Sequence, residues 1–203
     1  MRLKLVELPA RRACLLRWAD GRELILPKLV VRKLGLKPGS PLDPDKDYSH
    51  LVRTCVEVGL SYSLGLLSRR DWYRKELEER LRERGYLPEA IGEIVSELAR
   101  RGYLSDEALA RSQVERLVEQ GYGPHYIRSR LLSRGAPRVA VEEVLAELSE
   151  PIRQQLSKVA RDLYRKLRPR LSGEELSSRL LRRLLSRGFE LDWVREVVTE
   201  LCD

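Results

Sequence analysis

The sequence predicts a mostly α-helical protein in which three tandem three-helix repeats form an elongated, curved array behind a small β-rich N-terminal module. A similar pattern occurs three times, at residues 80–98, 130–148 and 183–201. Each copy has a glycine at its sixth position, with apolar residues at steps of three and four on both sides of it. The spacing between successive glycines leaves room for a further helix before each copy, so each repeat has three helices.

The glycine of each copy marks the end of one helix and the start of a turn into the next. Gly85, Gly135 and Gly188 follow the last apolar residue of the first helix, where a left-handed residue ends a helix and glycine adopts that conformation most readily. A unit with this period cannot bury its apolar face alone, and it needs stacked neighbours. We therefore expect each repeat to pack against the next.

The first 46 residues have a different pattern. Short apolar runs at 2–7, 12–18 and 22–26 indicate strands, and Asp20-Gly21 between the last two is a strong hairpin signal. Pro27 is expected to open a short helix that ends near Leu34. Such a small module needs to pack against another part of the protein to be stable.

These patterns divide the chain into four expected segments. They are a hairpin-containing module at 1–46 and three-helix repeats at 47–101, 102–149 and 150–203. Asp47 or a neighbour is expected to cap the first long helix, and Ser105 the first helix of the second repeat. The remaining helices are expected at 72–84, 88–101, 124–134, 137–149, 151–168, 172–187 and 190–202.

Composition indicates a soluble, cytoplasmic protein that spans no membrane and needs no cofactor. Of the 203 residues, 42% are hydrophobic and 34% are charged, and no apolar run is long enough to span a membrane. The three cysteines are scattered and lack the spacing of a disulfide framework or a zinc site. The net charge of +8 is concentrated at the two ends of the chain, which favours a polyanionic partner or an acidic surface.

No pattern of catalytic residues is present. The two histidines, His50 and His125, lie in different repeats, and the sequence contains none of the common nucleophile, metal or phosphate-binding motifs. We therefore expect a protein that is not an enzyme.

Arginines recur at fixed positions before the repeat glycines, and glutamates recur after them. One interpretation is structural, because basic residues in a last turn complement the helix dipole and can pair with glutamates on the adjacent helix. The other is a ladder of arginines along a partner's acidic or phosphate-lined groove. The partner-binding candidates are Arg80, Arg84, Arg130, Arg134, Arg183 and Arg187.

A denser basic run lies in the third repeat. A solvated helix face explains part of it, but few acidic residues interrupt it, so contact with phosphates or with an acidic protein surface is an equal alternative. These DNA-binding or acidic-surface candidates are Arg161, Arg165, Lys166, Arg168, Arg170, Arg179 and Arg182.

The chain from Tyr62 to Leu148 resembles the RecX family of regulators of the RecA recombinase. The resemblance rests on a GYLxDxxxA helix start at 102–110, followed by Val114 and Arg116, and on a GxxxIxxxLxxxG element at 123–135. A preceding segment at 66–86 matches the family's Leu-Ser-Arg-Arg sequence. Departures at Tyr73, Ser105 and Leu109 affect capping and packing.

The resemblance implies a non-enzymatic inhibitor that binds in the groove of the RecA–single-stranded DNA filament. It would limit filament growth, ATP hydrolysis, strand exchange and co-protease activity in DNA repair and SOS regulation. It also implies a monomer whose contact with single-stranded DNA is either direct or made through the filament. The alternative is a stand-alone DNA-binding regulator of the helix-turn-helix type, because three-helix units with basic faces also describe that class.

Overall fold

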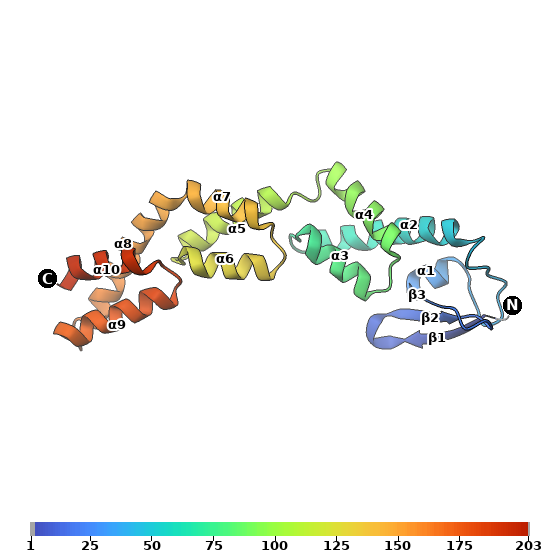
Figure 1. Ribbon diagram of the computed structural model, residues 1–203, viewed down its shortest axis with the longest axis horizontal. Helices are drawn as coiled ribbons and strands as arrows, with labels where there is room; N and C mark the ends of the chain where they lie inside the picture. The colour runs from blue at the N-terminus through green and yellow to red at the C-terminus, as the bar shows by residue number, and fades with distance from the viewer. Residues whose placement is uncertain (1–2, 203) are drawn as a thin grey trace. The chain divides into compact units, whose positions relative to one another are not determined.

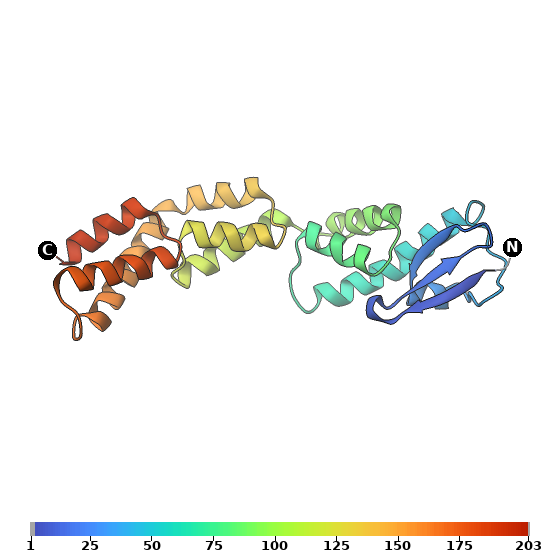
Figure 2. The same cartoon turned by 60° about the horizontal axis from the view of Figure 1, so that its bottom comes forward.

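The computed structural model describes residues 3–202 and confirms the predicted fold class (Figures 1 and 2). Ten helices and one three-stranded antiparallel sheet are present in that range. The contacts divide the chain into two compact units, which meet between Ser105 and Asp106. The elongated shape and the boundaries of the four sequence segments stay predictions.

The sheet consists of β1 (Lys4–Leu8), β2 (Ala13–Arg17) and β3 (Glu23–Pro27), in that order. A short 3₁₀ helix, η1 (Pro9–Arg11), joins β1 to β2. The predicted Asp20-Gly21 hairpin joins β2 to β3, and Gly21 has a φ of +89°. The indole nitrogen of Trp18 donates a buried hydrogen bond of 2.8 Å to the carbonyl of Leu42, which holds the following linker against the sheet.

The sheet and the helices of the first unit share one apolar core. The helices are α1 (Lys28–Lys33), α2 (Tyr48–Leu67), α3 (Arg74–Glu83) and α4 (Pro88–Arg100). In Figure 1 the strands lie beside α1 and the start of α2. The fully buried side chains of this core come from the sheet and from all four helices, and they include Leu16, Leu26, Val30, Leu51, Cys55, Leu77, Leu81, Ile94 and Leu98. The N-terminal module is thus stabilised by packing on the first repeat.

Asp47 precedes α2 as predicted, but its side chain does not cap the helix. Its carboxylate instead accepts a hydrogen bond of 2.9 Å from the backbone N–H of Asp43, in the linker. Asp47 therefore stands at the N-cap position of α2, but its carboxylate binds the linker and makes no capping hydrogen bond to the helix.

The second unit contains six helices: α5 (Asp106–Glu119), α6 (Pro124–Ser133), α7 (Arg138–Glu147), α8 (Ser149–Leu167), α9 (Gly173–Ser186) and α10 (Leu191–Cys202). Helix α8 begins two residues before the expected start at Pro151. Proline is tolerated there because the first turn of a helix needs no N–H from it.

Most of the aligned apolar positions are buried in all three copies of the pattern, whereas Leu148, Val197 and Leu201 are half-buried. In the first helix of each copy, the two aligned residues have no exposed surface. Across the three copies these residues are Leu77, Leu81, Ile127, Leu131, Leu180 and Leu184. The three glycines end these helices with φ of +82° at Gly85, +89° at Gly135 and +84° at Gly188. The left-handed helix stops are confirmed.

Two glycine turns pack closely against a neighbouring element. A Cβ added at Gly85 would lie 2.6 Å from Cγ2 of Ile25 in β3. At Gly188 an added Cβ would lie 2.6 Å from Cβ of Tyr126 in α6. The backbone N–H of Gly123 donates to the carbonyl of Arg187 at 2.9 Å, and that of His125 donates to the carbonyl of Gly188 at 3.0 Å. The end of α9 is thus joined to the start of α6 by main-chain hydrogen bonds.

Candidate functional site

Four of the basic side chains at the end of α8 lie along one exposed line. Lys158, Arg161, Arg165 and Arg168 follow one another at steps of three and four, so they share one side of the helix. The buried residues Ile152, Leu156 and Ala160 lie on the opposite side. We call these four basic residues the α8 stripe.

The α8 stripe has little acidic compensation. Arg165 lies 3.8 Å from Asp162, and in the part of the chain that the structure describes the other three side chains have no ion-pair partner. All four are exposed. The stripe spans about 15 Å, since an α-helix rises 1.5 Å per residue. It therefore presents a row of solvated positive charge to a partner.

The remaining predicted members of the basic run do not join this line. Lys166 lies on another side of α8, and Arg170 lies in the turn before α9. On α9, Arg182 and Arg183 lie three and four residues after Arg179, on neighbouring parts of the helix surface, and Arg182 donates to the carbonyl of Ser178 at 3.3 Å. The sequence candidates therefore divide into one stripe and several separate positions.

The arginines that precede the repeat glycines have mixed environments. Arg80 pairs with Glu83 at 3.1 Å, and the guanidinium of Arg84 lies 5.0 Å from the ring centre of Tyr62. Arg187 donates to the carbonyl of Gly121 at 3.2 Å. Arg134 is half-buried, and Arg130 and Arg183 are exposed. Arg187 thus has a structural role, while Arg130 and Arg183 are accessible to a partner.

Several repeat glutamates pair with arginines other than the predicted ones. Glu147 in α7 pairs with Arg111 in α5 at 2.6 Å, and Glu196 in α10 lies 3.4 Å from Arg153 in α8. These ion pairs join the first and third helices of a repeat. Sequence alignment of the copies did not reveal them, because these arginines precede the aligned segment.

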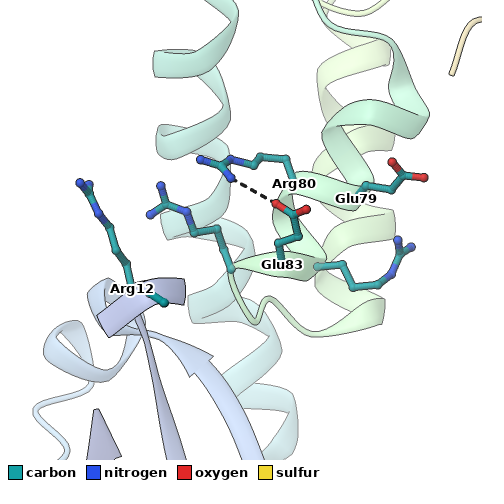
Figure 3. A pocket seen from close by; sticks show the side chains of 7 residues that line it. Arg12, Glu79, Arg80 and Glu83 are labelled. Atoms are coloured by element: carbon teal, nitrogen blue, oxygen red, sulfur yellow. Dashed lines mark hydrogen bonds and ion pairs between the residues drawn. The ribbon is translucent and has the colours of Figure 1, made fainter. Parts of the chain in front are cut away.

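A basic groove in the first unit was missed by sequence reasoning. Two adjoining cavities of about 790 and 500 Å³ share Arg12 and Arg84 as lining residues. Figure 3 shows the larger of the two. We call them together the N-terminal groove. Its described lining comes from the sheet, η1 and the residue after it, α1, α2, α3 and the turn after α3: Glu7, Leu8, Pro9, Ala10, Arg12, Ala13, Pro27, Lys28, Leu29, Arg32, Tyr62, Glu79, Arg80, Arg82, Glu83, Arg84 and Tyr86.

The N-terminal groove carries an excess of positive charge. Six of these lining residues are basic and three are acidic. Lys28 pairs with Glu7 at 2.9 Å. Among the described residues, Arg12, Arg32 and Arg82 have no acidic partner within ion-pair distance. No local pattern connects the residues of β2 with those that follow α3, so only the fold brings this charge together.

The other side-chain chemistry of the described chain is limited. Within residues 3–202, no three His, Cys, Asp or Glu side chains lie close enough together to hold a metal ion. His50 and His125 are both exposed and lie in different units. No helix in the same range is long and apolar enough to cross a membrane.

Packed helices with solvent-facing arginines are typical of proteins that bind a partner through their helical surfaces. No protein-family model matches the chain. Regulatory protein RecX of Pseudomonas syringae pv. tomato is 33% identical over 138 residues, which are 68% of this chain and 87% of that protein. Regulatory protein RecX of Thermus thermophilus is 36% identical over 132 residues, which are 65% and 84% of the two chains.

Solved structures share the fold. The crystal structure of a regulatory protein RecX superposes with a TM-score of 0.65 over 98% of both chains, at 19% identity. That of RecX from Lactobacillus salivarius gives a TM-score of 0.66, at 23% identity, over 72% of this chain and 96% of its own. The chain belongs to the RecX family, which is a family of regulatory proteins and not of enzymes.

Proposed function

We propose that this protein inhibits the RecA recombinase by binding in the groove of the RecA–single-stranded DNA filament. Bound there, it limits filament growth, ATP hydrolysis, strand exchange and co-protease activity, and so restrains DNA repair and the SOS response. Membership of the RecX family supports RecA as the partner. The structural observation that carries the proposal is the α8 stripe, a one-sided row of exposed and largely unpaired basic side chains.

The α8 stripe has the charge and length to follow a polyanionic surface. Each exposed ion pair contributes about 0.5 kcal/mol, so the four side chains together contribute about 2 kcal/mol, or about 30-fold in affinity. Contacts of this kind are screened by salt over a Debye length of about 8 Å at physiological ionic strength. Inhibition is therefore expected to weaken as the salt concentration rises.

The test compares two variants with the same loss of charge in the same unit. The first changes Lys158, Arg161, Arg165 and Arg168 to Gln. The second is the matched control, and it changes the basic residues outside the stripe to Gln: Lys166, Arg170, Arg179 and Arg182. The measurement is single-stranded-DNA-dependent ATP hydrolysis by the RecA protein of the same organism, with this protein added below one copy per RecA subunit.

We expect the stripe variant to need about 30-fold more protein for half-maximal inhibition, and the control variant to inhibit almost as the parent does. Circular dichroism and thermal melting check that both variants keep their helices. Equal inhibition by the two variants would remove the α8 stripe from the interface. Absence of any effect of the parent protein on ATP hydrolysis would contradict the proposal as a whole.

The stand-alone DNA-binding alternative makes a different prediction. It expects tight, sequence-selective binding to duplex DNA without RecA, with a strong dependence on salt. Weak binding that is indifferent to sequence favours the filament inhibitor. The predicted monomeric state is checked by sedimentation equilibrium of the same protein.

A further inference from the structure

The N-terminal groove combines a basic rim with an apolar floor. We call the lining arginines Arg12, Arg32 and Arg84 the rim, and the apolar lining residues Leu8 and Leu29 the floor. Leu29 is 48% exposed, which leaves a large apolar side chain open to a ligand. A charged rim around an apolar floor is the common composition of a site that binds a ligand of mixed chemistry.

Arg12 is held at the centre of this site by its backbone. It adopts a φ of +51°, in the left-handed region that residues other than glycine rarely occupy. Its N–H donates to the carbonyl of Pro9 at 3.1 Å, and its own carbonyl accepts from the N–H of Lys28 at 3.0 Å. The two hydrogen bonds fix the residue between η1 and the start of α1. Figure 3 shows its side chain on the sheet side of the cavity, with Arg80 and Glu83 of α3 on the other side.

We propose that the N-terminal groove binds an extended acidic peptide segment of a protein partner. Carboxylates of the segment pair with Arg12, Arg32 and Arg84, and one of its apolar side chains rests on Leu8 and Leu29. Arginine suits this role because its planar group binds a carboxylate through two parallel hydrogen bonds. The proposal is independent of the α8 stripe, which belongs to the other unit.

Aromatic burial and apolar lining residues favour a peptide over a nucleic acid. Single-stranded nucleic acid is bound by exposed aromatic rings on which bases stack. Here Tyr86 is only 5% exposed, and Arg84 lies over the ring of Tyr62. An apolar floor, by contrast, matches the side chain of a leucine or a phenylalanine.

The experiment measures fluorescence anisotropy of labelled probes with the full chain and without RecA. The probes are a short peptide of Asp, Glu and Ser residues around one central Leu, the same peptide with Ser in place of that Leu, and an oligothymidylate. The groove variant combines Arg12→Gln, Arg32→Gln and Arg84→Gln. Its matched control is a triple change of exposed basic residues in the same unit that do not line the groove: Lys46→Gln, Arg53→Gln and Arg69→Gln.

We expect the groove variant to bind the leucine-containing peptide at least about tenfold more weakly than the parent, and the control to remain within about twofold. Leu29→Ser should weaken binding of the leucine-containing peptide and leave that of the serine peptide unchanged. Arginine and glutamine are both non-glycine residues without a branched Cβ, so we expect the backbone at position 12 to be kept, and thermal melting checks the fold.

Three results would overturn the proposal. The first is an acidic peptide that does not bind the parent protein. The second is equal weakening by the groove and control variants. The third is tighter binding of the oligothymidylate than of the peptides, lost in the groove variant, which would make the groove a nucleic-acid site.

Discussion

Replacement of Gly188 by Ala tests how firmly the third repeat is joined to the second. The left-handed φ of +84° is unfavourable for alanine by about 1–2 kcal/mol. The added Cβ would also overlap the backbone nitrogen of Tyr126 and lie 3.0 Å from its Cα. Because backbone atoms cannot rotate away as a side chain can, the end of α9 must separate from the start of α6.

That separation breaks the two main-chain hydrogen bonds of the junction. Each contributes about 1 kcal/mol. Added to the backbone term, the expected loss in the free energy of unfolding of the second unit is about 3–4 kcal/mol. The matched control is Gly173→Ala, because Gly173 has a φ of +55° in the same unit and its added Cβ would meet no atom within 4 Å. It should lose only about 1–2 kcal/mol.

Hydrogen exchange followed by mass spectrometry separates these outcomes, because it reports the free energy of opening for each segment. Peptides from 124–133 and 173–186 should lose most protection in Gly188→Ala, while peptides from 3–105 keep theirs. If the two variants lower the opening free energy of these segments by the same amount, the close contact at Gly188 does not stabilise the junction.

Two further predictions concern single side chains of the first unit and of the C-terminal helix. Burial raises the pKa of the Cys55 thiol to about 11. Iodoacetamide at neutral pH should therefore modify the partly exposed Cys202 before Cys55. Faster labelling of Cys55 than of Cys202 in the native protein would contradict the burial of Cys55. Hydrogen bonds from Arg100 and Arg101 lower the pKa of Glu97 to about 2. The stability that this pairing adds is therefore present above a pH of about 4.5 and is lost as the pH falls toward 2. When Arg100 and Arg101 are both changed to Gln, the midpoint of the NMR titration of Glu97 should return toward 4.5.

Local patterns were sufficient to predict the repeats and the hairpin. The helices of each copy follow from apolar steps of three and four, and positions such as Leu81, Leu131 and Leu184 are all fully buried. Gly188 and Asp20-Gly21 carry conformational signals that do not depend on the rest of the chain. Such features are written in a few neighbouring residues, so they can be predicted from sequence.

Features that depend on distant residues were not predictable in the same way. Asp47 has the composition of a helix cap, yet its carboxylate binds the linker that folds back on it. Arg12 and Arg84 line one groove although they belong to different elements far apart in the sequence. The α8 stripe could be predicted only in part. Helical spacing places its residues on one side of α8, but only the burial of Leu156 on the opposite side shows that the stripe faces solvent.

The common core of residues 3–105 decides how this protein can be dissected. Leu26 and Val30 belong to the same buried cluster as Leu51 and Cys55, so a cut after residue 46 does not fall between two independently folded pieces. A truncated chain would expose the apolar side of α2 and tend to aggregate. If such a truncated protein failed to inhibit, the cause would be its aggregation and not the loss of a binding surface. The function of the three strands must therefore be tested by substitutions of their exposed side chains.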